Sequence, residues 1–367
     1  MKIRAFITHK KAEYFKDCQD RFSINPDTKS VAVSDGMSQS YQQKIWAEML
    51  VNAYTTNTEW IPNQASVKAV APQWFQKVNQ FIQELRDANA PQWLIIMNNN
   101  ALAQQKSAGA TFCGIRFNGD EWSGYVLGDS CLIEIANNKI QKLYTSQTGD
   151  AFDNHPDYFD SNPLKNGKGD SLAIKGTLDQ STTIILVSDP FSDLLNEKQK
   201  LGNEEDFVKQ LLAINNHDEF EKLVADWRDN YNMHNDDTTI IIIEHDDCDS
   251  FNVAYCDDLD ALIADENQSI QKTNDDTSSA ENHNEQKVSE EQQTPSITVV
   301  HTNEGKITEP KSELMIDSVD EFVQTGMRLY MEYVEKENSI LYSFSDDDEY
   351  NIFRKTLMDL YILYKNK

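Results

Sequence analysis

Residues 110–136 read ATFCGIRFNGDEWSGYVLGDSCLIEIA. It holds three short runs rich in Val, Ile and Phe, at 110–117, 122–127 and 132–136, joined by links that contain Gly, Asn or Asp. Runs of this composition between such residues predict β-strands. Because links of this length join antiparallel neighbours, the stretch predicts an antiparallel sheet made of consecutive hairpins.

Further strands and several helices are predicted on both sides of this stretch. Strand-type runs recur at 3–8, 30–34, 182–187 and 238–243. Apolar residues at the 3,4 spacing of amphipathic helices occur over residues 42–54, 74–85, 92–105, 205–214 and 218–229. The helices are grouped and do not alternate strictly with strands. We therefore expect an α+β fold in which helices pack outside the sheets.

The charge balance excludes two classes of partner. The chain of 367 residues has 33 Lys and Arg against 61 Asp and Glu, a formal net charge of −28. A surface this acidic repels the phosphates of nucleic acid and of anionic membranes, so we expect neither as a partner. The same charge is compatible with binding cations.

The cysteines and the N-terminus indicate a cytoplasmic protein. The five cysteines are odd in number and form no CxxC pair, which argues against a disulfide framework or a zinc knuckle. The N-terminal residues lack the apolar core of a signal peptide. No apolar run approaches the ~20 residues that span a bilayer.

Composition divides the chain into three parts. Residues 1–247 are predicted to form the globular domain, and residues 248–295 an acidic, largely disordered linker. Within it, residues 265–295 contain no Phe, Trp or Tyr and cannot bury enough apolar surface to fold. Residues 296–367 are predicted to form a small, mostly helical unit without a catalytic pattern. One interpretation makes this unit an adaptor or a regulatory element that the linker tethers to the globular domain.

Four aspartates occur where predicted strands end or begin. Asp35 closes SVAVSD, Asp129 closes YVLGD and Asp189 closes TTIILVSD, whereas Asp236 opens DDTTIIII. In antiparallel sheets, the C-terminal end of one strand and the N-terminal end of another can lie at the same edge. The four acids are therefore candidates for a common site.

Each aspartate also has a purely structural alternative. Asp35 can belong to an ordinary turn, and Asp129 to a hairpin loop. Asp189 can cap a helix that has Pro190 at its first position, and Asp236 can be a solvated strand entry. Taken together, these alternatives do not explain why long apolar strands repeatedly end in an acid.

Crowded carboxylates need cations to coexist unless they are protonated. Oxygen ligands without His or Cys favour Mg²⁺, Mn²⁺ or Ca²⁺ over zinc or copper. Two such ions can acidify a shared water and clamp a phosphoryl group for in-line attack. The sequence contains no P-loop and no GxSxG nucleophile motif, which argues against a nucleotide-binding P-loop protein and a serine hydrolase.

Six motifs in order resemble the protein phosphatase 2C family over residues 1–247. They are Cys18-Gln19-Asp20, Val33-Ser34-Asp35-Gly36-Met37, Gly109-Ala110-Thr111, Gly128-Asp129-Ser130, Val187-Ser188-Asp189 and Asp236-Asp237-Thr238-Thr239. The resemblance implies a four-layer αββα sandwich of two antiparallel β-sheets flanked by helices. It also implies a metal-dependent Ser/Thr phosphatase in signalling, which takes phosphoprotein substrates and works with a cognate Ser/Thr kinase.

The resemblance assigns roles to individual residues. Asp35 would bridge two Mg²⁺ or Mn²⁺ ions and the Gly36 carbonyl would bind one of them, while Asp189 and Asp236 complete the other shell. Asp20 would orient metal-bound water, and Asp129 would hold a third ion. A hydroxide between the metals would then attack the phosphate ester directly.

Several positions depart from the family pattern. Ser38-Gln39 replace a Gly-Gly pair, Pro190 follows Asp189, and Gln19 stands where many members have Glu. Phe15 occupies the position of the usual phosphate-binding Arg. These departures leave open a second interpretation, a pseudophosphatase that binds partners without turnover.

Cationic residues near Phe15 are candidates to replace the missing Arg, because cationic donors stabilise phosphoryl oxygens. His9 is the first candidate for a phosphate contact or a general acid, and a surface histidine after a strand is its alternative. Lys16 and Arg21 are weaker phosphate candidates, and Lys10 is a further possibility.

Overall fold

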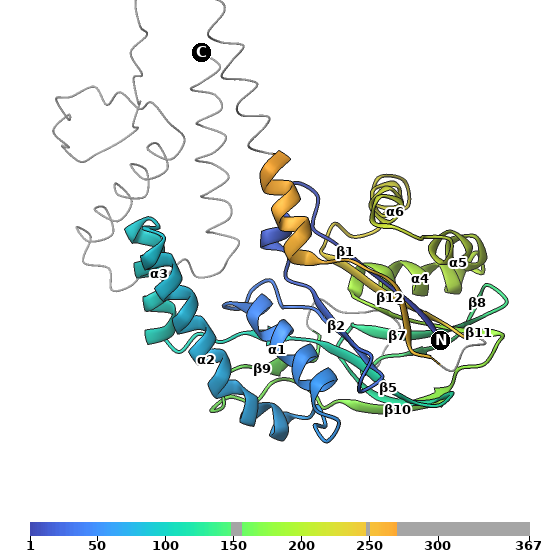
Figure 1. Ribbon diagram of the computed structural model, residues 1–367, viewed down its shortest axis with the longest axis horizontal. Helices are drawn as coiled ribbons and strands as arrows, with labels where there is room; N and C mark the ends of the chain where they lie inside the picture. The colour runs from blue at the N-terminus through green and yellow to red at the C-terminus, as the bar shows by residue number, and fades with distance from the viewer. Residues whose placement is uncertain (148–155, 247–249, 270–367) are drawn as a thin grey trace, which may run out of the picture. The chain divides into compact units, whose positions relative to one another are not determined.

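The computed structural model describes residues 1–147, 156–246 and 250–269 (Figure 1). Residues 270–295 of the predicted linker and the C-terminal unit predicted at 296–367 lie outside the described residues. Within the described part of the chain, no helix has the length and apolar character needed to cross a membrane.

Six strands form the first sheet, in the order β13-β1-β12-β11-β7-β8. Their bounds are β1 Lys2–Thr8, β7 Cys131–Ala136, β8 Lys139–Tyr144, β11 Thr182–Val187, β12 Thr238–Glu244 and β13 Asn252–Cys256. Neighbouring strands are antiparallel, except that β13 pairs parallel to β1. The expected fold of two antiparallel sheets flanked by helices is confirmed, and β13 adds one parallel pair at the edge of the first sheet.

Five strands form the second sheet, in the order β10-β6-β5-β3-β2, and all its neighbours are antiparallel. Their bounds are β2 Arg21–Asn25, β3 Ser30–Ser34, β5 Phe112–Asn118, β6 Glu121–Leu127 and β10 Leu172–Thr177. A short pair, β4 Gly109–Ala110 and β9 Phe159–Asp160, stands apart from both sheets.

Residues 110–136 supply strands to both sheets. The first predicted hairpin is confirmed, because β5 pairs with β6. The second is wrong: β7 pairs with β8 and β11, so the link Gly128-Asp129-Ser130 crosses from one sheet to the other. Gly128 has a φ of 87°, a left-handed conformation that glycine adopts without strain. The crossing places Asp129 at the end of the sandwich, where the two sheets meet.

Six helices are described with complete bounds. They are α1 Gln43–Thr56, α2 Gln64–Asp87, α3 Gln92–Ala103, α4 Asp189–Leu201, α5 Glu204–Leu212 and α6 His217–Asn230. A single 3₁₀ turn, η1, covers Phe15–Asp17, and a further helix covers residues 259–269. The helices predicted from apolar spacing are all present, with ends that differ by a few residues except at α2, which starts ten residues earlier.

Three apolar cores separate the layers. The period-two alternation of a strand sends successive residues to opposite faces, and the four isoleucines of β12 follow it. Ile240 and Ile242 pack with α4, α5 and α6, whereas Ile241 and Ile243 pack between the two sheets. A third core lies between the outer face of the second sheet and α1, α2 and α3. The order of layers is thus helix, sheet, sheet, helix, with the two helical groups on opposite sides in Figure 1.

The folded part extends past residue 247. Strand β13 lies in the range predicted as linker and pairs with β1 at the edge of the first sheet. A helix over residues 259–269 follows it in the chain. The strand's residues alternate between exposed and half-buried positions and include no fully buried side chain. This weak apolar signal explains why composition alone placed the domain boundary too early.

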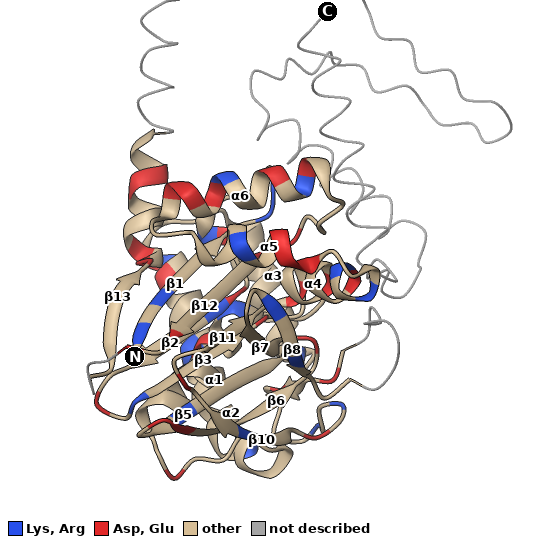
Figure 2. Cartoon of the chain, turned by 90° about the vertical axis from the view of Figure 1, so that its right-hand side faces the viewer, with Lys and Arg blue, Asp and Glu red and all other residues tan. Residues whose placement is uncertain are grey.

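The net negative charge is spread over the surface of the helices. Figure 2 shows acidic residues, in red, along the ribbon of α6, whose sequence HDEFEKLVADWRDN carries five Asp and Glu. The apolar residues of the same helix, Phe220, Val224 and Trp227, are buried against the first sheet. Most of the acidic charge on α6 therefore faces solvent and contributes to solubility.

Candidate active site

Pairing registers explain why acids that are far apart in the sequence meet. Val187 pairs with Ile240 and with Cys131, so the end of β11 lies beside the starts of β12 and β7. The acids that flank these strand ends are Asp129, Asp189 and Asp236.

The second sheet supplies two more acids. Arg21 pairs with Ser34, which places Asp20 and Asp35 next to each other at the ends of β2 and β3. Thr111 fixes the backbone of Asp35 on both sides: its amide donates to the Asp35 carbonyl at 2.9 Å, and its hydroxyl accepts from the Asp35 amide at 3.2 Å. We call Asp20, Asp35, Asp129, Asp189 and Asp236 the acid cluster.

The members of the acid cluster affect one another electrostatically. Burial raises the pKa of Asp35 well above its usual value, and the charges of Asp20, Asp189, Asp129 and Asp236 raise it further. Burial raises the pKa of Asp189 in the same way, with Asp129 and Asp236 as the next causes. Like charges raise each other's pKa only at close range. The ends of both sheets therefore contribute to one site.

Three carboxylate oxygens of the acid cluster are buried without a hydrogen-bond partner. They are Oδ2 of Asp20, Oδ1 of Asp129 and Oδ1 of Asp189. Asp20 is 1% exposed and Asp129 6% exposed. Leaving a buried acceptor unsatisfied is costly, and the cost is larger for charged groups. Unpartnered carboxylate oxygens in a group of like charges are the donors that a hard divalent cation prefers.

The donor chemistry fits Mg²⁺ or Mn²⁺, but the side chains do not yet form a closed shell. Among the described residues, no three His, Cys, Asp or Glu side chains are arranged to hold a metal ion. Gly36, whose carbonyl is the expected backbone ligand, is buried, and a Cβ there would lie 3.0 Å from the carbonyl oxygen of Gln19. The backbone therefore passes close to the cluster at Gly36.

Asp193 is a neighbour of the site that the sequence analysis missed. It lies one helical turn after Asp189 on α4, and its charge raises the pKa of both Asp129 and Asp189. Burial raises the pKa of Asp193 itself, while His234 lowers it. The i, i+4 spacing from Asp189 places both side chains on one helix face. This spacing is the sequence pattern that could have identified Asp193 as a neighbour of the site.

Asp237 is a second missed residue, and it holds the loop that follows β1. Its side chain is buried and accepts hydrogen bonds from the amides of Lys10 at 3.0 Å and Gln19 at 2.6 Å. These two bonds fix both ends of the loop that leads to Asp20. Arg228 supports the same region, because its guanidinium donates to the Asp236 carbonyl at 2.5 Å and to the His9 carbonyl at 3.0 Å.

His9 does not face the acid cluster. Its Nδ1 lies 2.7 Å from the carbonyl oxygen of Lys10, and its Nε2 lies 3.5 Å from Oε1 of Glu266. The ring packs edge-on against Phe15, whose amide donates to Glu266 at 2.9 Å. Glu266 belongs to the helix over 259–269, so the segment after β13 holds His9 and Phe15 together.

The two weaker phosphate candidates also point elsewhere. The ammonium of Lys16 lies over the ring of Tyr14, 5.1 Å from its centroid. The guanidinium of Arg21 donates to the backbone carbonyls of Cys18 at 2.8 Å and Asp20 at 2.6 Å. Lys10, in contrast, reaches the cluster, with Nζ 3.1 Å from Oδ1 of Asp236. Burial lowers the pKa of Lys10, but Asp236 and Asp237 more than reverse this and raise it.

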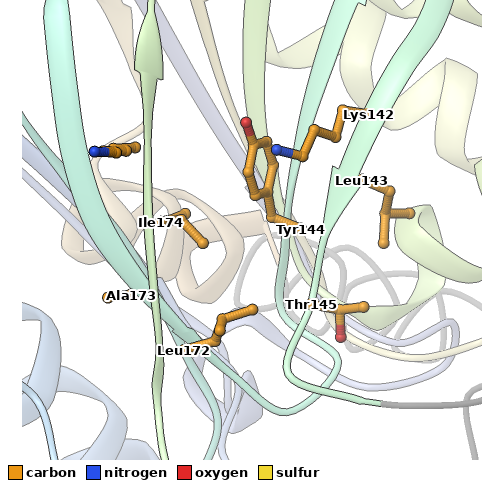
Figure 3. Close-up of a pocket in the computed structure, with 8 residues that line it drawn as sticks. Lys142, Leu143, Tyr144, Thr145, Leu172, Ala173 and Ile174 are labelled. Carbon is orange, nitrogen blue, oxygen red and sulfur yellow. The ribbon is translucent and has the colours of Figure 1, made fainter.

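The cavity in Figure 3 lies away from these acids. It has a volume of about 430 Å³ and opens between β8 and β10, the edge strands of the two sheets. Residues 142–145 and 172–175 line it, and the ammonium of Lys142 lies 4.0 Å from the ring centroid of Tyr144. No member of the acid cluster lines this cavity.

Because the acids repel one another, the stability of the metal-free protein should fall as the pH rises. Burial, with the Asp237 charge as the next cause, raises the pKa of Asp20 to about 7, and burial raises that of Asp129 to about 7. An acid with a raised folded-state pKa contributes stability below its unfolded value near 4 and loses it as the pH rises through 7. Thermal unfolding in EDTA should therefore show a melting temperature several degrees lower at pH 8 than at pH 5.

Two controls accompany this measurement. Mn²⁺ should remove most of the difference, because a bound cation favours the ionised carboxylates. The variant Asp20→Asn should show a smaller fall, while groups elsewhere in the protein titrate as before. A metal-free protein whose stability is unchanged or rises between pH 5 and pH 8 would contradict the electrostatic description of the acid cluster.

Comparisons with known proteins give one family and a group of solved structures. A family model described as Protein phosphatase 2C matches residues 15–227. The structure of the photosystem II phosphatase PBCP is similar at 15% identity and a TM-score of 0.42, covering 67% of this chain and 99% of that one. The structure of the serine/threonine phosphatase Stp1 from Staphylococcus aureus is similar at 13% identity and a TM-score of 0.42. The match covers 66% of this chain and 94% of that one. The structure of PppA from Pseudomonas aeruginosa is similar at 15% identity and a TM-score of 0.39. The match covers 66% of this chain and 96% of that one. No curated protein sequence matches the chain.

Proposed function

Since the chain belongs to the protein phosphatase 2C family, we propose that it is a Mg²⁺- or Mn²⁺-dependent phosphatase of phosphoserine and phosphothreonine in proteins. The observation that carries this proposal is the acid cluster. Five aspartates from both sheets lie at one end of the sandwich, and three of their buried oxygens lack a hydrogen-bond partner.

The expected ligands divide by position into a set for two core ions and a set for a third ion. Asp35, the Gly36 carbonyl, Asp189 and Asp236 would hold two ions between the sheets. Asp129 and Asp193, whose charge raises the pKa of Asp129, would hold a third. Bound ions would acidify water and neutralise the charge of the phosphoryl group. Closing these shells requires the carboxylates of the cluster to rotate toward the ions.

Asp20 would orient the attacking water, and the loop after β1 would hold Asp20 in position. The unpartnered Oδ2 of Asp20 is free to accept a hydrogen bond from the attacking water and to orient it. Asp237 fixes the loop that leads to Asp20 through its bonds to the amides of Lys10 and Gln19. His9, which lies against Glu266 and Phe15, would position this loop and would not touch the phosphate.

A direct assay tests the proposed activity. The purified full-length protein should hydrolyse p-nitrophenyl phosphate and a phosphothreonine peptide with Mn²⁺, at least about 100-fold faster than with EDTA, since metal ions supply several kcal/mol of charge stabilisation. Mg²⁺ should support a lower or similar rate. Turnover that persists in EDTA would contradict a metal-dependent mechanism.

The alternative is a pseudophosphatase that binds a partner without turnover. Two observations favour it: Phe15 stands where the family has its phosphate-binding Arg, and the described acids do not form a ready metal shell. Calorimetry with Mn²⁺ separates the two functions. Binding at two or more sites together with turnover supports the phosphatase, and a folded protein that binds no Mn²⁺ supports the pseudophosphatase.

Location and partners remain part of this proposal. The four described cysteines, Cys18, Cys113, Cys131 and Cys256, are free thiols, which agrees with the cytoplasmic location expected from the sequence. A phosphoprotein substrate and a cognate Ser/Thr kinase follow from the proposed activity.

A further inference from the structure

Lys10 brings a positive charge into the acid cluster. Its Nζ lies 3.1 Å from Oδ1 of Asp236 and 3.1 Å from the hydroxyl of Ser38. Asp236 lies two residues before the start of β12, and Ser38 lies in the loop that follows Asp35 and Gly36. The ammonium therefore joins two segments that are expected to hold metal ions.

The position of Lys10 is fixed by its backbone and not by the ion pair alone. Its amide donates to the buried carboxylate of Asp237 at 3.0 Å. The side chain is 15% exposed, so it lies at the rim of the cluster and still reaches solvent. A four-carbon side chain on an anchored backbone can move its ammonium by several Å without a change of the loop.

A divalent ion and the Lys10 ammonium need the same carboxylate. Asp236 is an expected ligand of a core ion, and Lys10 already occupies one of its oxygens. Two cations this close repel each other strongly in a partly buried site. An ion bound at Asp236 therefore favours movement of the ammonium away from Oδ1.

The displaced ammonium has a natural acceptor in the substrate. A phosphoryl group bound at the ions carries negative oxygens, which favour charge-assisted hydrogen bonds. The family's Arg is absent at Phe15, and the side chains of Lys16 and Arg21 lie over Tyr14 and on backbone carbonyls. Lys10 is thus the cation of this loop that reaches the cluster.

We propose that Lys10 exchanges partners: its ammonium neutralises Asp236 when the site holds no divalent ion, and it binds the substrate's phosphoryl oxygens when the ions are present. This inference rests on the proposed function. It makes Lys10 a phosphate-binding residue and, in the metal-free protein, a competitor of the metal.

The variant Lys10→Met tests both halves, because it keeps the length of the side chain and removes the charge. Calorimetric titration with Mn²⁺ should show binding at least about 3-fold tighter than in the wild type, since an ion pair that competes with the metal is gone. Binding of inorganic phosphate to the Mn²⁺-loaded protein should weaken by about 10-fold or more, as expected for loss of a charged hydrogen bond. The KM for p-nitrophenyl phosphate should rise by a similar factor.

Lys11→Met is the matched control. It removes the same charge from the neighbouring position, where the side chain is 63% exposed and its Nζ lies 2.6 Å from Oδ1 of Asp229. The affinities of Lys11→Met for Mn²⁺ and for inorganic phosphate should stay within about twofold of those of the wild type. Lys10→Arg should restore most of the phosphate affinity, and thermal unfolding confirms that each variant is folded.

The outcomes separate this inference from the proposed function. Weaker Mn²⁺ binding by Lys10→Met, or unchanged phosphate binding, would overturn the exchange even in an active enzyme. If the wild type binds Mn²⁺ and phosphate without turnover and Lys10→Met shows both shifts, the exchange holds and the proposed phosphatase activity fails. A wild type that binds no Mn²⁺ overturns both.

Discussion

Replacing Asp35 by asparagine is expected to abolish Mn²⁺-dependent phosphatase activity and to stabilise the metal-free protein. Asp35 lies between the ends of both sheets, where the charges of four other aspartates raise its pKa. Loss of the carboxylate expected to bridge two ions should lower kcat/KM by about 10³-fold or more, the scale of losing one main charge-stabilising contact. Without metal, the same change removes a negative charge from a group of like charges.

The opposite signs of the two effects make this prediction specific. Activity is measured with p-nitrophenyl phosphate and Mn²⁺, and stability by thermal unfolding in EDTA at pH 8. A mutation that merely damaged the fold would lower both. Asp206→Asn is the control, because the Asp206 side chain is 86% exposed on α5, and it should change neither quantity measurably. An active Asp35→Asn variant would refute the assigned role of Asp35.

Replacing Gly124 by alanine is expected to lower the stability of the protein strongly. Gly124 lies in the β5–β6 pair of the second sheet. Gly124 pairs with Ile115 across β5 and β6. A Cβ on Gly124 would lie 2.0 Å from the carbonyl oxygen of Gly114 and 2.8 Å from Cα of Ile115. Both atoms belong to the backbone of a buried strand and cannot move aside as a flexible side chain would. Gly124→Ala should therefore push β5 and β6 apart.

The expected cost of Gly124→Ala is at least about 3 kcal/mol, at the upper end of overpacking effects. For a folded domain of this size, the melting temperature should fall by about 10 °C. Gly119→Asn is the control: Gly119 has a φ of 66°, a Cβ there meets no atom within 4 Å, and Asn tolerates this conformation. It should cost about 1 kcal/mol or less. A Gly124→Ala variant as stable as this control would contradict the close approach of the two strands.

Strands with strong apolar runs could be predicted from the sequence, and weak ones could not. The run of four isoleucines in β12 is buried on both faces, and its apolar sequence predicts a strand directly. Strand β2, with the sequence RFSIN, is half-buried throughout and lies at a sheet edge. Strand β13 is similar, with exposed residues at every second position. Edge strands bury little apolar surface, so their hydrophobic pattern is faint.

The acids at strand ends could be predicted, whereas the residues that support them could not. An aspartate that closes a buried strand stands out in the sequence. Asp237 does its work through two backbone amides of a loop more than two hundred residues away, and no local pattern shows such a contact. The same limit applies to the cations near Phe15. The choice between Lys10 and Lys16 depends on the path of the loop, which Asp237 and Glu266 determine.

A crystal structure with Mn²⁺, in which anomalous scattering locates the ions, shows directly whether the acid cluster binds metal. At least two Mn²⁺ peaks are expected at the shared end of the sheets, both within about 2.5 Å of the Asp35 carboxylate. One should also contact Asp236, with the Lys10 ammonium moved away from it. Mn²⁺ peaks only elsewhere on the protein, with Asp35 unliganded, would contradict it.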